Sequence, residues 1–160
     1  MGIILFITAV FLSSVLAPVA LLHTVVGAIR YGGKYRYVDS AFLRGAKALD
    51  VFGNVAYATF LNDLFIQKGG YHYGNECETI SSATGKNWVT GKLTWLGLGL
   101  AGTLNLIDKD HCWKYIDGDK DLFHAIGYPG KVKWYYTFSF ISISVILFGF
   151  LCRFYWWILT

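Results

Sequence analysis

The sequence predicts an all-α integral membrane protein in which two transmembrane helices flank a small helical module. Residues 3–29 and 134–152 carry no charge, whereas the segment between them holds all but one of the 14 basic residues and all 10 acidic residues. At about 1.5 Å per helical residue, each uncharged stretch reaches or approaches the ~30 Å hydrocarbon core of a bilayer. We therefore expect a first span at 1–30, a module at 31–131 and a second span at 132–160.

The first stretch is predicted to be an anchor, with a cleaved signal peptide as the alternative. It lacks a basic region before its apolar run, the run is long for a signal peptide, and no clear small-residue cleavage site follows it. Pro18 predicts a kink in the helix. His23 is expected to hydrogen-bond a neighbouring helix, because polar side chains inside a membrane find partners.

Aromatic side chains bracket the second stretch, as expected where amphipathic rings sit at the two lipid–water boundaries. Trp134 and Tyr135 mark one boundary, and Trp156 and Trp157 mark the other. Arg153 is placed to extend its charged group to the interface while its stem lies in the apolar layer. These five residues are the predicted membrane anchors.

Basic residues cluster where both stretches meet the module. They are Arg30, Lys34, Arg36, Lys131 and Lys133. Because positive charge stays on the cytoplasmic side, we expect a multi-pass protein of the inner membrane with a cytoplasmic module and both termini outside. The module exceeds the roughly 60-residue loops to which this rule applies best. Three cysteines, an odd number, fit free thiols in a reducing compartment.

The module should begin with a basic turn at 31–36 and a helix from Asp39 or Ser40 to about Gln67, ended by the glycines that follow. A polar loop leads to residues 76–82, and residues 85–87 are expected to break and restart the chain. Asn87 would then cap a second helix that runs to about Ile107.

Gly97 and Ala101 have the small-residue spacing that lets helices pack closely. The uncharged part of their helix is too short for a comfortable span. We therefore expect it to be interfacial, re-entrant or packed against the first module helix. A short helix to Ile116 and an acidic turn at 117–122 should complete the module.

Two groups of residues carry side chains that bind metals. They are His72, Glu76, Cys77 and Glu78 in the first, and Asp108, Asp110, His111 and Cys112 in the second. Catalysis would use Glu78, Asp108, Asp110 and His111, and a divalent metal would use Glu78, Asp110, His111 and Cys112. The predicted helix between the groups is about 30 Å long, so they would converge only if the loops fold back. We therefore favour the interpretation in which Asp108 or Asp110 caps a helix and no cofactor is bound, with a divalent metal as the alternative.

Three other patterns are rejected as sites. Residues 80–87 lack the glycine and the hydroxyl residue that a phosphate-binding loop needs. Residues 117–121 lack the glycine and the distal glutamate of a calcium loop. A nucleophilic Ser81 or Cys112 with His111 gains no support from adjacent positions on one helix, and the small excess of positive charge favours lipid headgroups over nucleic acid.

An ordered pattern links the two groups: Gly69-Gly70, then Glu78-Thr-Ile-Ser-Ser, Gly85-Lys86, and Asp108-Lys-Asp-His-Cys. Over roughly residues 60–116 it resembles a group of short proteins of unassigned function that are encoded by tailed phages and prophages. This chain departs from them in a longer insert at 71–77 and in Ala83, where the group usually has Arg. The resemblance implies a phage origin and a structural core that joins the two blocks.

Three functions are compatible with these patterns. The first is a phage-encoded accessory protein that acts by contact with the bilayer and a host membrane protein, or as a homo-oligomer, in host takeover, superinfection exclusion or lysis assistance. The second is a metal-dependent hydrolase at the membrane surface. The third is a holin-like pore former or a virion membrane component.

Overall fold

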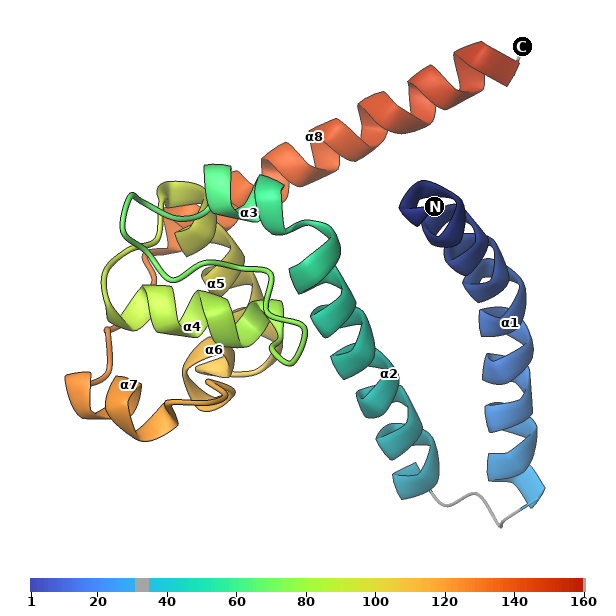
Figure 1. The fold of residues 1–160 in the computed structure, drawn as a ribbon, viewed down its shortest axis with the longest axis horizontal. Coiled ribbons are helices and arrows are strands. Elements are labelled where there is room, and N and C mark those ends of the chain that lie inside the picture. Colours follow the sequence, from blue (N-terminus) through green and yellow to red (C-terminus); the bar gives the residue numbers. More distant parts are fainter. Residues whose placement is uncertain (31–34, 160) are drawn as a thin grey trace. The chain divides into compact units, whose positions relative to one another are not determined.

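The computed structural model describes residues 1–30 and 35–159, and side chains at 1–30 and 38–159. Most of the expected basic turn at 31–36 lies outside the described residues. The described chain is all-α, as predicted, and contains no strand (Figure 1). Its helices are α1 (Gly2–Arg30), α2 (Tyr35–Ala56), α3 (Ala58–Leu64), α4 (Ile80–Val89), α5 (Trp95–Ile107), α6 (His111–Lys114), α7 (Lys120–Ile126) and α8 (Trp134–Leu159).

The chain forms two compact units, Met1–Ala48 and Leu49–Thr160. The first contains α1 and the greater part of α2. The second contains the end of α2 and all later helices. The candidate site described below lies wholly within the second unit.

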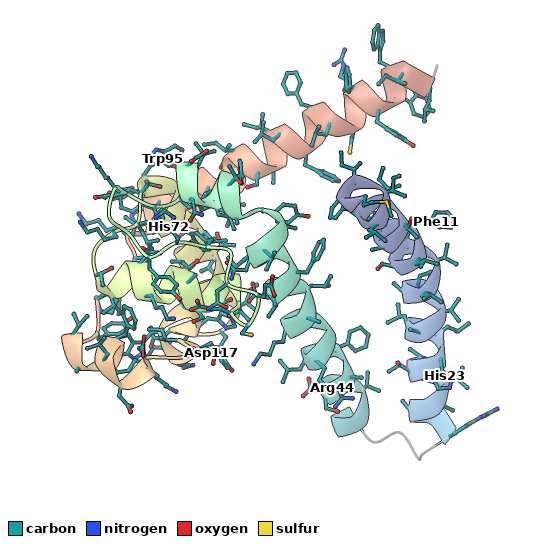
Figure 2. The ribbon with its side chains drawn as sticks, viewed as in Figure 1. Phe11, His23, Arg44, His72, Trp95 and Asp117 are labelled. Atoms are coloured by element: carbon teal, nitrogen blue, oxygen red, sulfur yellow. The ribbon has the colours of Figure 1, made fainter. Side chains whose placement is uncertain are left out.

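Helices α1 and α8 are long and apolar enough to cross a membrane, judged by length and composition. Beyond the beginning of α8, which packs against the module, most apolar side chains of both helices are exposed, as Phe11 of α1 is (Figure 2). Phe11 is 65% exposed, and Trp156, near the end of α8, is 70% exposed. A helix that is apolar on all sides needs either a protein interior or a lipid environment.

The first module helix begins earlier and is shorter than expected. It starts at Tyr35, before the predicted cap residues, and a turn at Tyr57 separates α2 from α3. The prediction of one helix to Gln67 was therefore wrong. Residues 65–67 instead pair with 92–94, through Thr94 N–H to the Phe65 carbonyl (3.0 Å) and Gln67 N–H to the Lys92 carbonyl (2.8 Å).

The predicted helix from Asn87 to Ile107 is in fact two helices. Thr79 caps α4 by accepting the Ser82 N–H at 3.1 Å, and Thr94 caps α5 by accepting the Gly97 N–H at 3.3 Å. The break lies at Gly91, whose φ of +66° suits glycine. Residues 85–87 do not interrupt the chain, because they lie inside α4.

Helix α5 packs chiefly against the beginning of α8, and also against α4 and α6 (Figure 1). Ala101 is fully buried, and a Cβ at Gly97 would collide with the Phe65 carbonyl. A Cβ at Gly99 or Gly102 would collide with Phe140 or Thr137 of α8. The small residues of α5 therefore allow two neighbouring segments to approach its backbone closely.

Two short helices complete the unit. Helix α6 falls where a short helix was expected, and its Cys112 lies so close to Gly85 of α4 that a side chain at Gly85 would collide with the Cys112 carbonyl. Helix α7 occupies residues that were predicted to form a turn and a connection. It packs against α4.

Candidate functional site

The centre of the module is a buried ion pair. Glu78, in the loop before α4, lies 2.8 Å from the ammonium group of Lys86 in α4, measured from Oε1 to Nζ. Glu78 is 2% exposed and Lys86 is 3% exposed. Removing two such charges from water is costly, so this pair holds only because other groups complete the hydrogen bonding around it.

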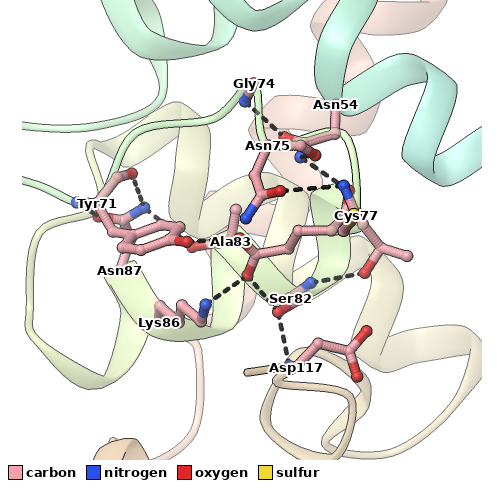
Figure 3. A network of polar contacts seen from close by, with 12 residues as sticks. Asn54, Tyr71, Gly74, Asn75, Cys77, Ser82, Ala83, Lys86, Asn87 and Asp117 are labelled. Atoms are coloured by element: carbon pink, nitrogen blue, oxygen red, sulfur yellow. Dashed lines mark hydrogen bonds and ion pairs between the residues drawn. The ribbon is translucent and has the colours of Figure 1, made fainter. Parts of the chain in front are cut away.

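Two hydroxyl groups complete the surroundings of the carboxylate (Figure 3). Tyr71 donates to Oε2 at 2.7 Å, and Ser82 donates to Oε1 at 2.5 Å. The Lys86 ammonium also lies 4.2 Å from the centre of the Tyr71 ring, a cation–π distance. Ser82 in turn accepts the Asp117 N–H at 2.8 Å, which ties the pair to the segment before α7.

Burial alone would lower the pKa of Lys86, because a charged ammonium is poorly solvated inside a protein. Its interactions with Glu78 and Tyr71 outweigh this effect and raise the pKa above its ordinary value of 10.5. Lys86 is therefore a permanently charged structural group at neutral pH. It is unsuited to act as a general base there.

Three asparagines hold the loop between α3 and α4 through bonds to its backbone. Asn54 accepts from Gly74 N–H and donates to the carbonyls of residues 75 and 78. Asn62 bonds both the N–H and the carbonyl of residue 73, and Asn87 does the same at residue 71. The loop has no regular secondary structure, so these side-chain amides pair backbone N–H and carbonyl groups that would otherwise be buried without hydrogen bonds.

Of these three asparagines, the sequence singled out only Asn87, as a helix cap, and it indicated no role for Asn54 or Asn62. The available signal was an isolated amide on an otherwise apolar helix. Buried amides are usually hydrogen-bonded, so such a residue predicts a partner elsewhere in the chain.

A second network of hydrogen bonds joins α2, α4, α6 and the segment between α5 and α6. Asp50 of α2 accepts the Ile80 N–H at 3.1 Å and the Ser81 hydroxyl at 2.7 Å. Ser81 Oγ lies 3.2 Å from His111 Nε2, and His111 Nδ1 lies 3.3 Å from an Asp108 oxygen. Asp108 also accepts from the Lys114 ammonium at 2.8 Å, and Lys114 with His111 lowers the Asp108 pKa.

The order Ser81–His111–Asp108 is that of a hydrolase triad, but the bond between Ser81 and His111 does not have the triad's direction. A catalytic histidine accepts the serine proton at Nε2. Here the Ser81 hydroxyl donates its hydrogen bond to Asp50, so it cannot also donate to His111 Nε2, which lies 3.2 Å away. Ser81 is also only 3% exposed, so the arrangement supports a structural clamp and not an activated nucleophile.

The two sequence blocks therefore meet in space, through Ser81 and His111. They converge because the chain turns at Gly91, so that α5 returns past α4 and α6 packs against α4. Their metal-binding residues nevertheless take different partners: Glu78 pairs with Lys86, Asp110 accepts from the Tyr128 hydroxyl at 2.6 Å, and Cys112 is fully buried. Among the described residues, no group of three or more His, Cys, Asp or Glu side chains is placed to hold a metal ion.

The remaining candidate residues do not join a site. His72, Glu76 and Cys77 are exposed in the loop before α4. Burial raises the pKa of the Cys112 thiol to about 12, with the nearby Asp50 acting in the same direction. Cys112 is therefore a poor nucleophile and a poor metal ligand at neutral pH.

No family model, curated protein or solved structure matches this chain.

The buried pair generates a prediction for a double-mutant cycle. Glu78→Gln and Lys86→Met should each lower the free energy of unfolding by roughly 3–5 kcal/mol, because each leaves one buried charge unpaired. The double variant should lose much less than the sum of the two. Denaturant unfolding of the detergent-solubilised protein measures all three. The control is Lys114→Met, which removes an exposed pair of the same 2.8 Å length and should change little. Additive losses would contradict a coupled pair.

Alkaline pH should destabilise the fold. Burial raises the pKa of Tyr73 from 10.0 to about 12, and that of Cys112 from 9.0 to about 12. The unfolded chain therefore loses these protons first as pH rises, and the free energy of unfolding falls between pH 9 and 12. Lys86, whose pKa is also raised, adds to the loss above about pH 10.5.

Unfolding midpoints measured from pH 8 to 11 test this expectation. The variant Tyr73→Phe/Cys112→Ala removes two of the titrating groups and should show a flatter decline. An equally steep decline in the variant would show that other groups are responsible.

Proposed function

We propose that the chain is a phage- or prophage-encoded protein of the host inner membrane that acts by contact with a host membrane protein. The roles that fit are host takeover, superinfection exclusion or assistance to lysis. The observation that carries the proposal is the pair of terminal helices, which are apolar on every side. The phage origin rests on the sequence pattern that joins residues 69–86 to 108–112.

The boundaries of the helices favour a cytoplasmic module. Arg30 ends α1, and Lys131 and Lys133 come just before α8. Arg153 is the one basic residue beyond these positions in the printed sequence. Positive charge at the module ends of both helices favours retention of the module in the cytoplasm.

The polar interior of the module supports contact over catalysis. Glu78 and Lys86 satisfy one another, and Ser81 and His111 are committed to structural hydrogen bonds. Catalytic groups usually keep some unsatisfied capacity that faces a cleft. These side chains instead join helices and loops to each other.

The surface best suited to contact lies at the end of α2 and on α3. Leu49 is 71% exposed, Phe60 55% and Leu64 44%. Other residues of the same helices bond the module: Asp50 and Asn54 on α2, and Asn62 on α3. An apolar face on a helix that is fixed from behind matches the way amphipathic helices pack against partner helices.

Topology is tested by the exposed Cys77. A membrane-impermeant maleimide should label it in inverted inner-membrane vesicles and not in intact spheroplasts. Cys112 should stay unlabelled because it is buried. The variant Cys77→Ser is the control that identifies the labelled thiol. Labelling in intact spheroplasts would contradict the orientation, and release of the protein by alkaline carbonate would contradict membrane anchorage.

Contact is tested by placing a photo-crosslinking phenylalanine analogue at Phe60 in host cells. We expect an adduct with a host membrane protein at this position. The matched control is Leu122 on α7, which is 64% exposed and lies away from α3 in sequence. An adduct only between two copies of the chain, or equal adducts at both positions, would contradict the proposal.

A further inference from the structure

Helix α2 carries its apolar and its charged residues on different sides. Successive residues of a helix point roughly 100° apart, so positions three or four residues apart share a side. One side holds only apolar or small residues: Val38, Phe42, Gly45, Leu49, Phe52 and Ala56. From residue 38 onward, all charged and amide residues of α2 fall on the other side, at 39, 44, 47, 50 and 54. We call the first set the apolar stripe of α2.

The apolar stripe is exposed where the helix could have buried it. Phe42 is 51% exposed, and Gly45 and Leu49 are exposed as well. The contacts with the module come from the charged side, through Asp50 and Asn54. A helix of a water-soluble domain normally turns its apolar side towards the interior. Helix α2 does the reverse, so its stripe needs a cover that the module does not supply.

The connection to α1 indicates where this stripe lies. Arg30 ends α1 and Tyr35 begins α2, so four residues separate the two helices. At no more than about 3.6 Å per residue, the chain covers at most about 18 Å from residue 30 to residue 35. Where α1 crosses a bilayer, α2 therefore begins close to the headgroup layer.

The charge of this region matches an anionic lipid surface. Residues 30–47 include five basic residues and one acidic residue. Arg44 and Lys47 lie on the charged side of α2 and are exposed. Each basic residue near an anionic membrane surface strengthens binding by roughly fivefold. Basic residues on one side and Phe and Leu on the other are typical of helices that lie in a membrane interface.

We propose that α2 lies in the plane of the membrane, with its apolar stripe in the headgroup and acyl boundary of an anionic lipid surface. Such helices bury their apolar side by about 5–10 Å. This inference rests on the proposed membrane location. Leu49 belongs both to the stripe and to the proposed contact surface, so contact with a host protein takes place at the level of the headgroups.

Spin labels on single cysteines of the full-length protein test the depth of α2, in vesicles of phosphatidylcholine with about 30% phosphatidylglycerol. The background Cys77→Ser/Cys152→Ser removes the exposed thiols, and the buried Cys112 stays unlabelled. Collisions with oxygen, which concentrates in lipid, are compared with collisions with a water-soluble nickel chelate.

The decisive comparison is Gly45→Cys in the stripe against Leu43→Cys on the charged side. A side chain at residue 45 meets open space and Leu43 is exposed, so both variants should fold normally. We expect the oxygen-to-nickel collision ratio to be several-fold higher at residue 45. Gly149→Cys, in α8, also meets open space and provides the reference for a membrane span.

A second measurement tests the preference for anionic lipid. In vesicles of phosphatidylcholine alone, the ratio at residue 45 should fall. The variant Arg44→Gln/Lys47→Gln should give the same low ratio in both kinds of vesicle. The control Lys68→Gln/Lys120→Gln removes the same charge at exposed positions outside α2 and should keep the response.

The outcomes separate this inference from the proposed function. A nickel-accessible label at residue 45 would overturn the interfacial helix, and so would a label shielded from both reagents, which indicates cover by protein. In either case an oxygen-accessible, nickel-shielded label at residue 149 leaves the membrane proposal standing. A nickel-accessible label at residue 149 would overturn the membrane proposal itself. A ratio at residue 45 that does not respond to phosphatidylglycerol would overturn the preference for anionic lipid.

Discussion

The ion pair between Glu78 and Lys86 is the interaction on which the module depends. Its two charges are almost wholly withdrawn from water, and in isolation their desolvation would oppose folding. The pair is stable because Tyr71 and Ser82 donate to the carboxylate and the Tyr71 ring lies against the ammonium. Tyr71 and Glu78 belong to the loop before α4, whereas Ser82 and Lys86 belong to α4. The charges are therefore satisfied only when the loop packs on α4 in this one arrangement.

Further hydrogen bonds connect the segments that carry this pair to the rest of the module. The loop that carries Tyr71 and Glu78 is held by the side chains of Asn54, Asn62 and Asn87, which lie on three helices. Ser82 also accepts a hydrogen bond from the Asp117 N–H, which connects the pair to the segment before α7. The small size of Gly85 then lets α6 rest directly on α4. One buried pair therefore fixes the relative positions of a loop and several helices.

The sequence was sufficient for the all-α class and for the two long terminal helices, because length and the absence of charge are local properties of a stretch. The break between α4 and α5 was missed, although Thr79 and Thr94 are both good cap residues and Gly91 lies between them. A continuous apolar pattern outweighed those signals. The partners of Glu78 and of the three asparagines could not be predicted, since they join residues far apart in the chain and depend on how the helices fold back.

The satisfied polar groups and the exposed apolar groups of the module lie in different places. In the interior, titratable side chains such as Glu78 and His111 are committed to bonds that hold helices together. The exposed apolar side chains lie elsewhere, as Leu49 of α2 and Phe60 of α3 do. A rigid polar interior beneath an exposed apolar surface is the arrangement that the proposed contact with membrane partners requires.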